Sequence, residues 1–153
     1  MLKNLYLVVH ILCVSIWFGA NIVLAFVSPR MANASAEVRR FWAQTQGAMA
    51  RVLYNVAGVG VLLTGILLVV SSDGEFEFKN AFVSVGFLAV VVGAGLGMAV
   101  FGPGSRQLDA AIERGDEAQE RAINNKLAMF GIIDSLVLIV TVVAMVAKWG
   151  LGN

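Results

Sequence analysis

Several polar side chains of this sequence lie inside long apolar segments, where burial in lipid makes them costly and therefore chemically informative. In the first segment, His10, Trp17 and Asn21 are separated by seven and four residues. At about 100° per residue they share one narrow stripe of a helix, which we expect to face the interior of the protein. A histidine on that stripe needs either a hydrogen-bond partner or a metal ion.

A second group of polar residues is predicted to share one depth, near the inner third of a membrane. Its members, Asn21, Arg51, Asn55 and Asp134, come from three different apolar segments. An unpaired carboxylate at that depth is unfavourable, and a guanidinium can bind a carboxylate through two hydrogen bonds. The sequence therefore predicts an Arg51–Asp134 pair. It leaves open whether this cluster is a structural clasp or a substrate or proton site.

Soft metal ligands are also spaced for a common site. His10 and Cys13 lie one helical turn apart, and Met145 is expected at a comparable outer level. Such a set suits Cu(I). The alternatives are that Cys13 and Met145 are ordinary apolar core residues, and that His10 alone either ligates haem or is a hydrogen-bonded structural residue.

The elements that must position these residues are four apolar runs, at about 5–27, 49–70, 81–101 and 127–147. Each reaches the ~20 residues that a ~30 Å hydrocarbon core requires, and only helices satisfy the backbone there. Hydrophobic residues make up 59% of the chain and charged residues 14%, far from the balance of soluble domains. We predict an all-α transmembrane four-helix bundle with short cytoplasmic helical extensions, forming one domain over 1–153. The expected helices are 4–28, 36–71, 79–102 and 117–149.

Local signals refine the helix ends. Ser35 and Asp116 are suitable N-cap residues, and Gly115 is a suitable stop before the last helix. Pro103-Gly104 is expected to end or kink the third helix. An alternative for the first 34 residues is a cleaved signal peptide ending at Ala32-Asn33-Ala34, although the apolar run is longer than usual for one.

Basic residues predict the orientation. Eight of the eleven lysines and arginines lie in or beside the first and third loops, and only Lys3, Lys79 and Lys148 fall on the other side. This distribution predicts that both loops lie in the cytoplasm and both termini lie outside. The membrane expected is the cytoplasmic (inner) membrane. The net charge of +1 gives no reason to expect nucleic acid as a partner. With a single cysteine, the chain forms no internal disulfide.

Small residues form a stripe on the third predicted helix. Gly86, Ala89, Gly93 and Gly97 recur at three- and four-residue intervals. Such stripes allow two helices to approach closely. The stripe predicts either packing within the bundle or an interface for a homodimer or a larger membrane complex.

Several short motifs resemble the CopD-like superfamily of small four-helix membrane proteins, which includes the HemJ-type protoporphyrinogen oxidases. The features that carry the resemblance over nearly the whole chain are His10 with Ile16-Trp17-Phe18-Gly19, Pro29-Arg30, Leu63-Thr64-Gly65-Ile66 and Phe78-Lys79. Gly102-Pro103 to Arg106 and the segment Met145-Val146-Ala147-Lys148 resemble an uncharacterised branch more closely.

In the HemJ type, the helix-one histidine is implicated in binding haem b, and a lysine opening helix three is functionally important. The resemblance therefore implies that His10 ligates haem b and that Lys79 reaches a haem propionate. Met145, or His10 of a second copy of the chain, is then a candidate for the sixth iron position. The further histidines of the HemJ type are missing, because this chain has one histidine. Bis-histidine ligation within one chain is thus excluded.

The expectation from these features is a small integral membrane protein that associates with haem b or serves as an accessory subunit of a membrane complex, rather than a stand-alone enzyme. One alternative is a HemJ-type protoporphyrinogen oxidase that uses His10 and Lys79, with Arg51 or Asp134 handling protons. Another is a copper or small-solute transport protein with Asn21, Arg51 and Asp134 along its path.

Overall fold

The computed structural model describes residues 2–151, and every regular element within that range is a helix. The predicted all-α, four-helix class is therefore confirmed. The described residues form nine helical segments: α1 (Leu2–Val27), η1 (Ser28–Asn33), α2 (Ala36–Met49), η2 (Ala50–Tyr54), α3 (Asn55–Val70), α4 (Ala81–Leu96), η3 (Gly97–Phe101), α5 (Gly102–Glu113) and α6 (Glu117–Val146). Of these, η1 is a 3₁₀ helix, and η2 and η3 are π-helices.

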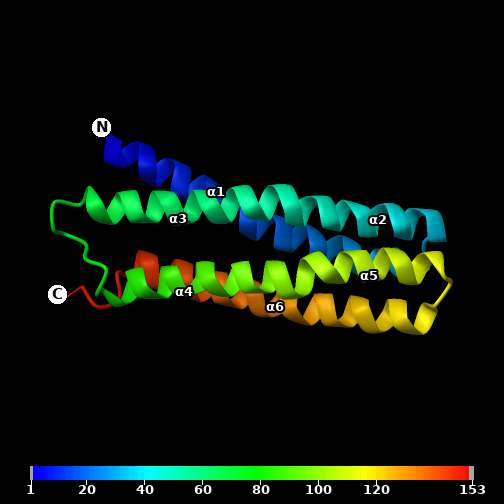
Figure 1. Cartoon of the computed structure of the whole chain (residues 1–153). Coiled ribbons are helices and arrows are strands. Elements are labelled where there is room, and N and C mark those ends of the chain that lie inside the picture. The colour runs from blue at the N-terminus through cyan, green and yellow to red at the C-terminus, as the bar shows by residue number, and fades with distance from the viewer. Residues whose placement is uncertain (1, 152–153) are drawn as a thin grey trace.

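These segments join end to end into four long rods that lie side by side (Figure 1). The rods are Leu2–Asn33, Ala36–Val70, Ala81–Glu113 and Glu117–Val146, and each is long and apolar enough to cross a membrane. At 1.5 Å per residue, rods of this length measure roughly 45–50 Å, which exceeds a ~30 Å hydrocarbon core. Part of each rod must therefore project beyond the bilayer.

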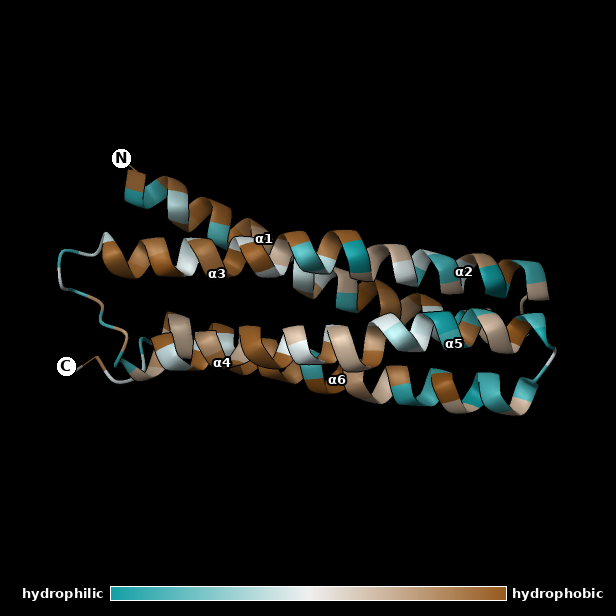
Figure 2. Cartoon of the chain, in the orientation of Figure 1, coloured by the Kyte–Doolittle hydropathy of each residue, from teal (hydrophilic) through white to brown (hydrophobic). Residues whose placement is uncertain are grey.

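The polar part of the bundle gathers at one end. Figure 2 shows apolar colouring along α1, α3 and α4, and polar colouring along α2, α5 and the beginning of α6. In the most apolar window of each rod, between 11% and 22% of the residues are buried, so most apolar side chains face outward. An apolar exterior over the membrane-length part, with a polar extension at one end, matches the predicted helical extensions.

The rods pack in pairs. α1 packs chiefly against α3, α4 against α6, and α2 against α5 in the extension. Figure 1 shows α1 crossing the bundle obliquely, with its N-terminal end away from α4 and α6. Contacts between α1 and α6 are correspondingly fewer than those between α1 and α3.

The third rod continues past Pro103 to Glu113, so the alternative that the helix ends at Pro103-Gly104 is wrong. In the π-helical turn η3, the Gly102 N–H donates to the Gly97 carbonyl, five residues earlier. Pro103 then occupies the first turn of α5, where a missing N–H costs least. The wider turn therefore allows the proline without interrupting the rod.

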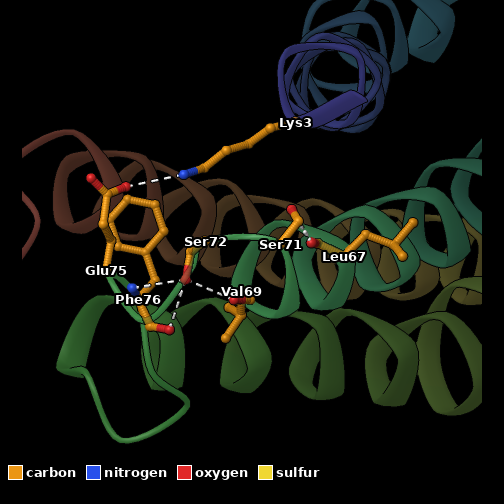
Figure 3. Close-up of polar contacts among 7 residues, drawn as sticks. All are labelled: Lys3, Leu67, Val69, Ser71, Ser72, Glu75 and Phe76. Carbon is orange, nitrogen blue, oxygen red and sulfur yellow. Dashed lines mark hydrogen bonds and ion pairs between the residues drawn. The ribbon is translucent and has the colours of Figure 1, made fainter. Parts of the chain in front are cut away.

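The connections between rods are fixed by side-chain caps. Ser35 accepts the Val38 N–H and Asp116 accepts the Gln119 N–H, as predicted for N-caps, and Gly115 has a left-handed φ of 69°. In the α3–α4 connection, the fully buried Ser72 hydroxyl lies 2.8 Å from the Val69 carbonyl oxygen and accepts the Phe76 N–H at 2.9 Å (Figure 3). Short-range hydrogen bonds of this kind hold each turn in place.

Candidate functional site

A buried carboxylate joins two rods near the middle of the bundle. Asp134 of α6 is 1% exposed, and its Oδ2 accepts hydrogen bonds from Trp17 Nε1 at 2.9 Å and Asn21 Nδ2 at 2.7 Å. Both donors come from α1, one turn apart, and both are buried. The predicted interior stripe of α1 is thus confirmed at these two residues. The arrangement satisfies a buried carboxylate with neutral donors.

A third rod completes the network through Tyr54. Its hydroxyl donates to Asn21 Oδ1 at 2.5 Å, so the Asn21 amide donates to Asp134 and accepts from Tyr54 at the same time. Tyr54 is the last residue of η2, and its ring stacks on Phe101 of η3, with 6.3 Å between the centroids. The two π turns therefore lie beside each other. π turns recur at functional sites because they redirect side chains.

Gly93 of α4 gives the Trp17 indole its space. A Cβ built at position 93 would collide with the Trp17 ring atoms Cζ2 and Cη2. Trp17 also belongs to a buried cluster with Ala57 and Leu138. Trp17 is thus held by three neighbouring rods with its N–H directed at Asp134. We call the four hydrogen-bonded residues Trp17, Asn21, Tyr54 and Asp134 the Asp134 network.

The predicted Arg51–Asp134 pair does not form. The Arg51 side chain is exposed, and among the described residues the ion pairs leave it without a carboxylate partner. Asn55, also exposed, donates to the Arg51 carbonyl of its own helix at 2.8 Å. A long basic side chain can extend toward water along the rod, whereas Trp17 and Asn21 have no such route.

Tyr54 is the member of the network that sequence reasoning missed. It follows Arg51 by three residues and therefore lies on nearly the same face and level of its rod. Its hydroxyl was a signal, because a tyrosine at this depth needs a hydrogen-bond partner. The π turn that aims it at Asn21 has no comparable signature in the residues themselves.

A groove of about 930 Å³ runs from the Asp134 network toward the polar end of the bundle. Its deep end is lined by Asn21 and Ser135. Along its length it is lined by apolar or small residues that include Leu24, Ala128 and Gly131. We call this feature the α1–α6 groove, since these two elements form its walls, with η1, α2 and α5 closing the polar end.

Ion pairs form the polar rim of the α1–α6 groove. Arg39 Nε lies 2.9 Å from Glu120 Oε1, with side chains only 21% and 11% exposed. Arg39 also donates to the Ala34 carbonyl at 2.7 Å. Arg121 and Glu117, one turn apart on α6, pair at 2.8 Å. All four charged residues line the groove, and their formal charges cancel.

Gln46 lines the same groove between the rim and the apolar part. Its residue is 9% exposed, and its Nε2 has no hydrogen-bond partner among the described residues. Trp42, one turn earlier on α2, uses its indole N–H on Ser28 at 3.2 Å. A buried amide nitrogen without a partner is uncommon in a folded protein. Of the groove-lining residues, Gln46 Nε2 and Arg39 Nε are both buried without a hydrogen bond, but Arg39 Nε has an ion-pair partner in Glu120 and Gln46 Nε2 has none.

His10 has a specific partner, Thr64 of α3. The distance from His10 Nδ1 to Thr64 Oγ1 is 2.9 Å, and Thr64 Oγ1 donates to the Gly60 carbonyl at 2.5 Å. Because the single hydroxyl proton is used on that carbonyl, Nδ1 is assigned as the donor to Thr64. His10 and Thr64 thus form a polar link between α1 and α3.

Of the residues predicted to share a haem or copper site with His10, Cys13 lies at the same α1–α3 interface as His10, whereas Met145 and Lys79 lie elsewhere. Cys13 is buried against Gly60, between α1 and α3. Met145 packs on Gly86 between α4 and α6, and the exposed Lys79 pairs with Glu77 at 2.7 Å. Within residues 2–151, three or more His, Cys, Asp or Glu side chains do not gather as a metal site. His10, Lys79 and Met145 thus contact different partners in this structure, and ligation of haem by His10 stays a prediction.

The glycine stripe of the third rod is mostly used inside the chain. Gly86 accommodates the Met145 methyl group and Gly93 accommodates Trp17, while Ala89 is buried. A Cβ built at Gly97 would meet open space. Of the three glycines expected at a dimer interface, Gly97 alone has an open face.

Chemically, the bundle offers a satisfied internal network and an open amphipathic groove beside it. Comparison of the chain with protein-family models, with curated proteins and with solved structures gave no match.

Proposed function

We propose that this chain is an accessory binding protein of the cytoplasmic membrane, with both termini outside, that holds an amphipathic small molecule in the α1–α6 groove. The observation that carries the proposal is the groove itself. Its volume of about 930 Å³ is that of a ligand site, at the upper end of the ~300–1,000 Å³ range usual for small-molecule pockets. It has a polar rim, an apolar length and a hydrogen-bonded deep end.

The position of the groove supports a ligand taken from the bilayer. The groove follows α6 from Glu117 to Leu136, which is roughly 28 Å at 1.5 Å per residue. Its rim lies in the polar extension, and its other end lies in the apolar part of the rods (Figure 2). A molecule with a polar head and a long apolar tail matches both ends.

The Asp134 network supports a positioning role. Asn21 belongs both to the network and to the deep end of the groove, so the groove has a firm wall there. The network residues bond to one another across three rods. This arrangement suits a preformed site, which lowers the ordering cost of binding.

Filling the groove tests the proposal. Gly131 lines the groove, and a Cβ built there meets open space, so Gly131→Trp should occupy the apolar part without an internal clash. Native mass spectrometry of protein extracted in a maltoside detergent should show a bound small molecule on the wild type. That adduct should fall at least several-fold in Gly131→Trp.

The matched control is Val140→Trp on the same rod. Val140 is 50% exposed and does not line the groove, so this variant adds the same side chain to an outward face. It should keep the wild-type adduct. Equal adduct levels in Gly131→Trp and the wild type would refute binding in the groove.

A further inference from the structure

The polar head that the groove accepts can be specified further, on the assumption that the proposed binding function is correct. Two observations bear on it. The rim charges are already paired, Arg39 with Glu120 and Arg121 with Glu117. The Gln46 amide nitrogen beside them is buried and has no partner among the described residues.

The paired rim disfavours a charged head. An anionic phosphate would compete with Glu120 for Arg39, and that pair is largely withdrawn from water. Breaking it would leave a buried carboxylate without its cation, which is costly. Arg39 is also tied to the Ala34 carbonyl at 2.7 Å. The largely buried Arg39 is thus committed to partners within the protein, and the exposed Arg121 faces the carboxylate of Glu117, which would repel an anionic head.

The unpartnered Gln46 Nε2 needs an acceptor, and a neutral oxygen supplies one. We infer that the α1–α6 groove binds an uncharged amphiphile whose carbonyl or hydroxyl oxygen accepts a hydrogen bond from Gln46, while its tail lies along Ala128 and Gly131 toward Asn21. A neutral glycerolipid and an isoprenoid quinone both present this chemistry. Gln46 is then the residue that selects the head.

Four probes separate this inference from its competitors. Delipidated full-length protein in a maltoside detergent would be titrated with dioleoylglycerol, a long-tailed isoprenoid quinone, dioleoylphosphatidylglycerol and squalene, with binding followed by native mass spectrometry. Dioleoylglycerol and the phosphatidylglycerol share the same tails, so the comparison isolates the head. The oxygen-bearing neutral probes should bind about three- to tenfold more tightly than squalene, as one neutral hydrogen bond allows. The phosphatidylglycerol should bind more weakly than dioleoylglycerol.

A substitution at Gln46 tests the hydrogen bond directly. Gln46→Met keeps the unbranched shape and removes an unpartnered polar group, so folding should be retained. It should lower affinity for dioleoylglycerol or the quinone about three- to tenfold and leave squalene binding unchanged. Gln44→Met is the matched control, because Gln44 is exposed on the same helix and bonds Asp109 instead.

The outcomes are distinct. Preference for dioleoylglycerol over the quinone, or the reverse, identifies the source of the accepting oxygen. Equal or tighter binding of the phosphatidylglycerol, or an unchanged affinity in Gln46→Met, would overturn the inference about the head. If neither Gln46→Met nor Gly131→Trp changes binding, the proposed function fails as well. If Gln46→Met leaves binding unchanged but Gly131→Trp abolishes it, binding in the groove is supported and only the proposed role of Gln46 is wrong.

Discussion

At the scale of single residues, Asp134 shows how an α-helical bundle can bury a carboxylate without a buried cation. Two neutral donors on one face of α1 bond the same carboxylate oxygen, and the Asn21 amide oxygen in turn accepts a hydrogen bond from the Tyr54 hydroxyl. Each donor would otherwise lack a partner in an apolar setting, so the network benefits all its members. Its strength should therefore lie in the combination rather than in any one charge.

We expect Asp134→Ala to lower the free energy of unfolding by about 1 to 3 kcal/mol, because two buried donors lose their acceptor and single hydrogen bonds within membranes are modest. Arg51→Ala should change it by less than about 0.5 kcal/mol, since the side chain is exposed. Denaturant titration in mixed micelles measures both. A large loss in Arg51→Ala, partly recovered in the double variant, would instead support an Arg51–Asp134 pair.

His10 is expected to act as a structural hydrogen-bonding residue. His10→Ala and Thr64→Val should each destabilise the bundle, and their effects should be non-additive by about 0.6 kcal/mol, because each change removes the same bond. The same unfolding titration, applied to the two single variants and the double variant, measures this non-additivity.

Titration of the purified protein with haemin should give no Soret band that depends on His10. A band present in the wild type and lost in His10→Ala would instead support ligation of haem by His10.

The sequence was sufficient to predict which polar residues of α1 face inward, because spacing fixes a helix face. It was also sufficient to bring Asn21 and Asp134 to one level, because rod length fixes depth. It was insufficient for the choice of Arg51 as the partner of Asp134. A guanidinium on a long stem can turn outward, whereas a buried indole cannot, and this choice depends on packing. The separation of His10 from Met145 likewise depends on the crossing of α1.

At the scale of elements, glycine spacing and π turns set how closely the rods approach. Gly93 lets α4 approach α1 at Trp17, and Gly86 lets it approach α6 at Met145. The stripe was visible in the sequence, but its partner was not, since small residues suit an internal or an external helix equally well. The π turns could not be predicted, because the segments around them are apolar on nearly every face, so the change of face that an extra residue causes does not appear in the hydrophobic pattern.

Gly93→Ala should disturb the Asp134 network from a distance. The new methyl group would overlap the Trp17 ring and force the indole away from Asp134, with an expected loss of about 1 to 3 kcal/mol in the free energy of unfolding. Gly95→Ala on the same helix meets open space and should be neutral or stabilising by up to about 1 kcal/mol, since alanine is the better helix former. Intrinsic tryptophan fluorescence adds a second readout, because only the first variant should alter the environment of Trp17. If Gly93→Ala and Gly95→Ala changed the free energy of unfolding and the fluorescence equally, Gly93 would not be what positions Trp17.

At the scale of the whole molecule, the groove lies between the second half of the first rod, from Asn21 to Asn33, and the first part of α6, from Glu117 to Leu136. Polar colouring gathers at one end of the bundle (Figure 2), along α2, α5 and the beginning of α6. The ion-paired Arg39 belongs to α2 and its partner Glu120 to the beginning of α6. Rod length and the polar extension could be predicted from the sequence. The groove could not, because it depends on how the first rod and α6 pack against each other.

The last prediction concerns orientation. The connections α1–α2 and α5–α6 lie at the same end of the bundle and the described ends of the chain lie at the other (Figure 1), so one orientation accounts for every loop. Eight of the eleven lysines and arginines belong to the end with the two connections or to the rods beside it. The preference for basic residues in cytoplasmic loops then predicts that this end lies inside.

In a Cys13→Ala background, which removes the buried native thiol, Ala118→Cys and Glu77→Cys give exposed reporters at opposite ends. An impermeant maleimide added to intact cells should label Glu77→Cys directly and Ala118→Cys only after permeabilisation. Labelling of Ala118→Cys in intact cells would reverse the orientation and place the rim of the α1–α6 groove outside the cell.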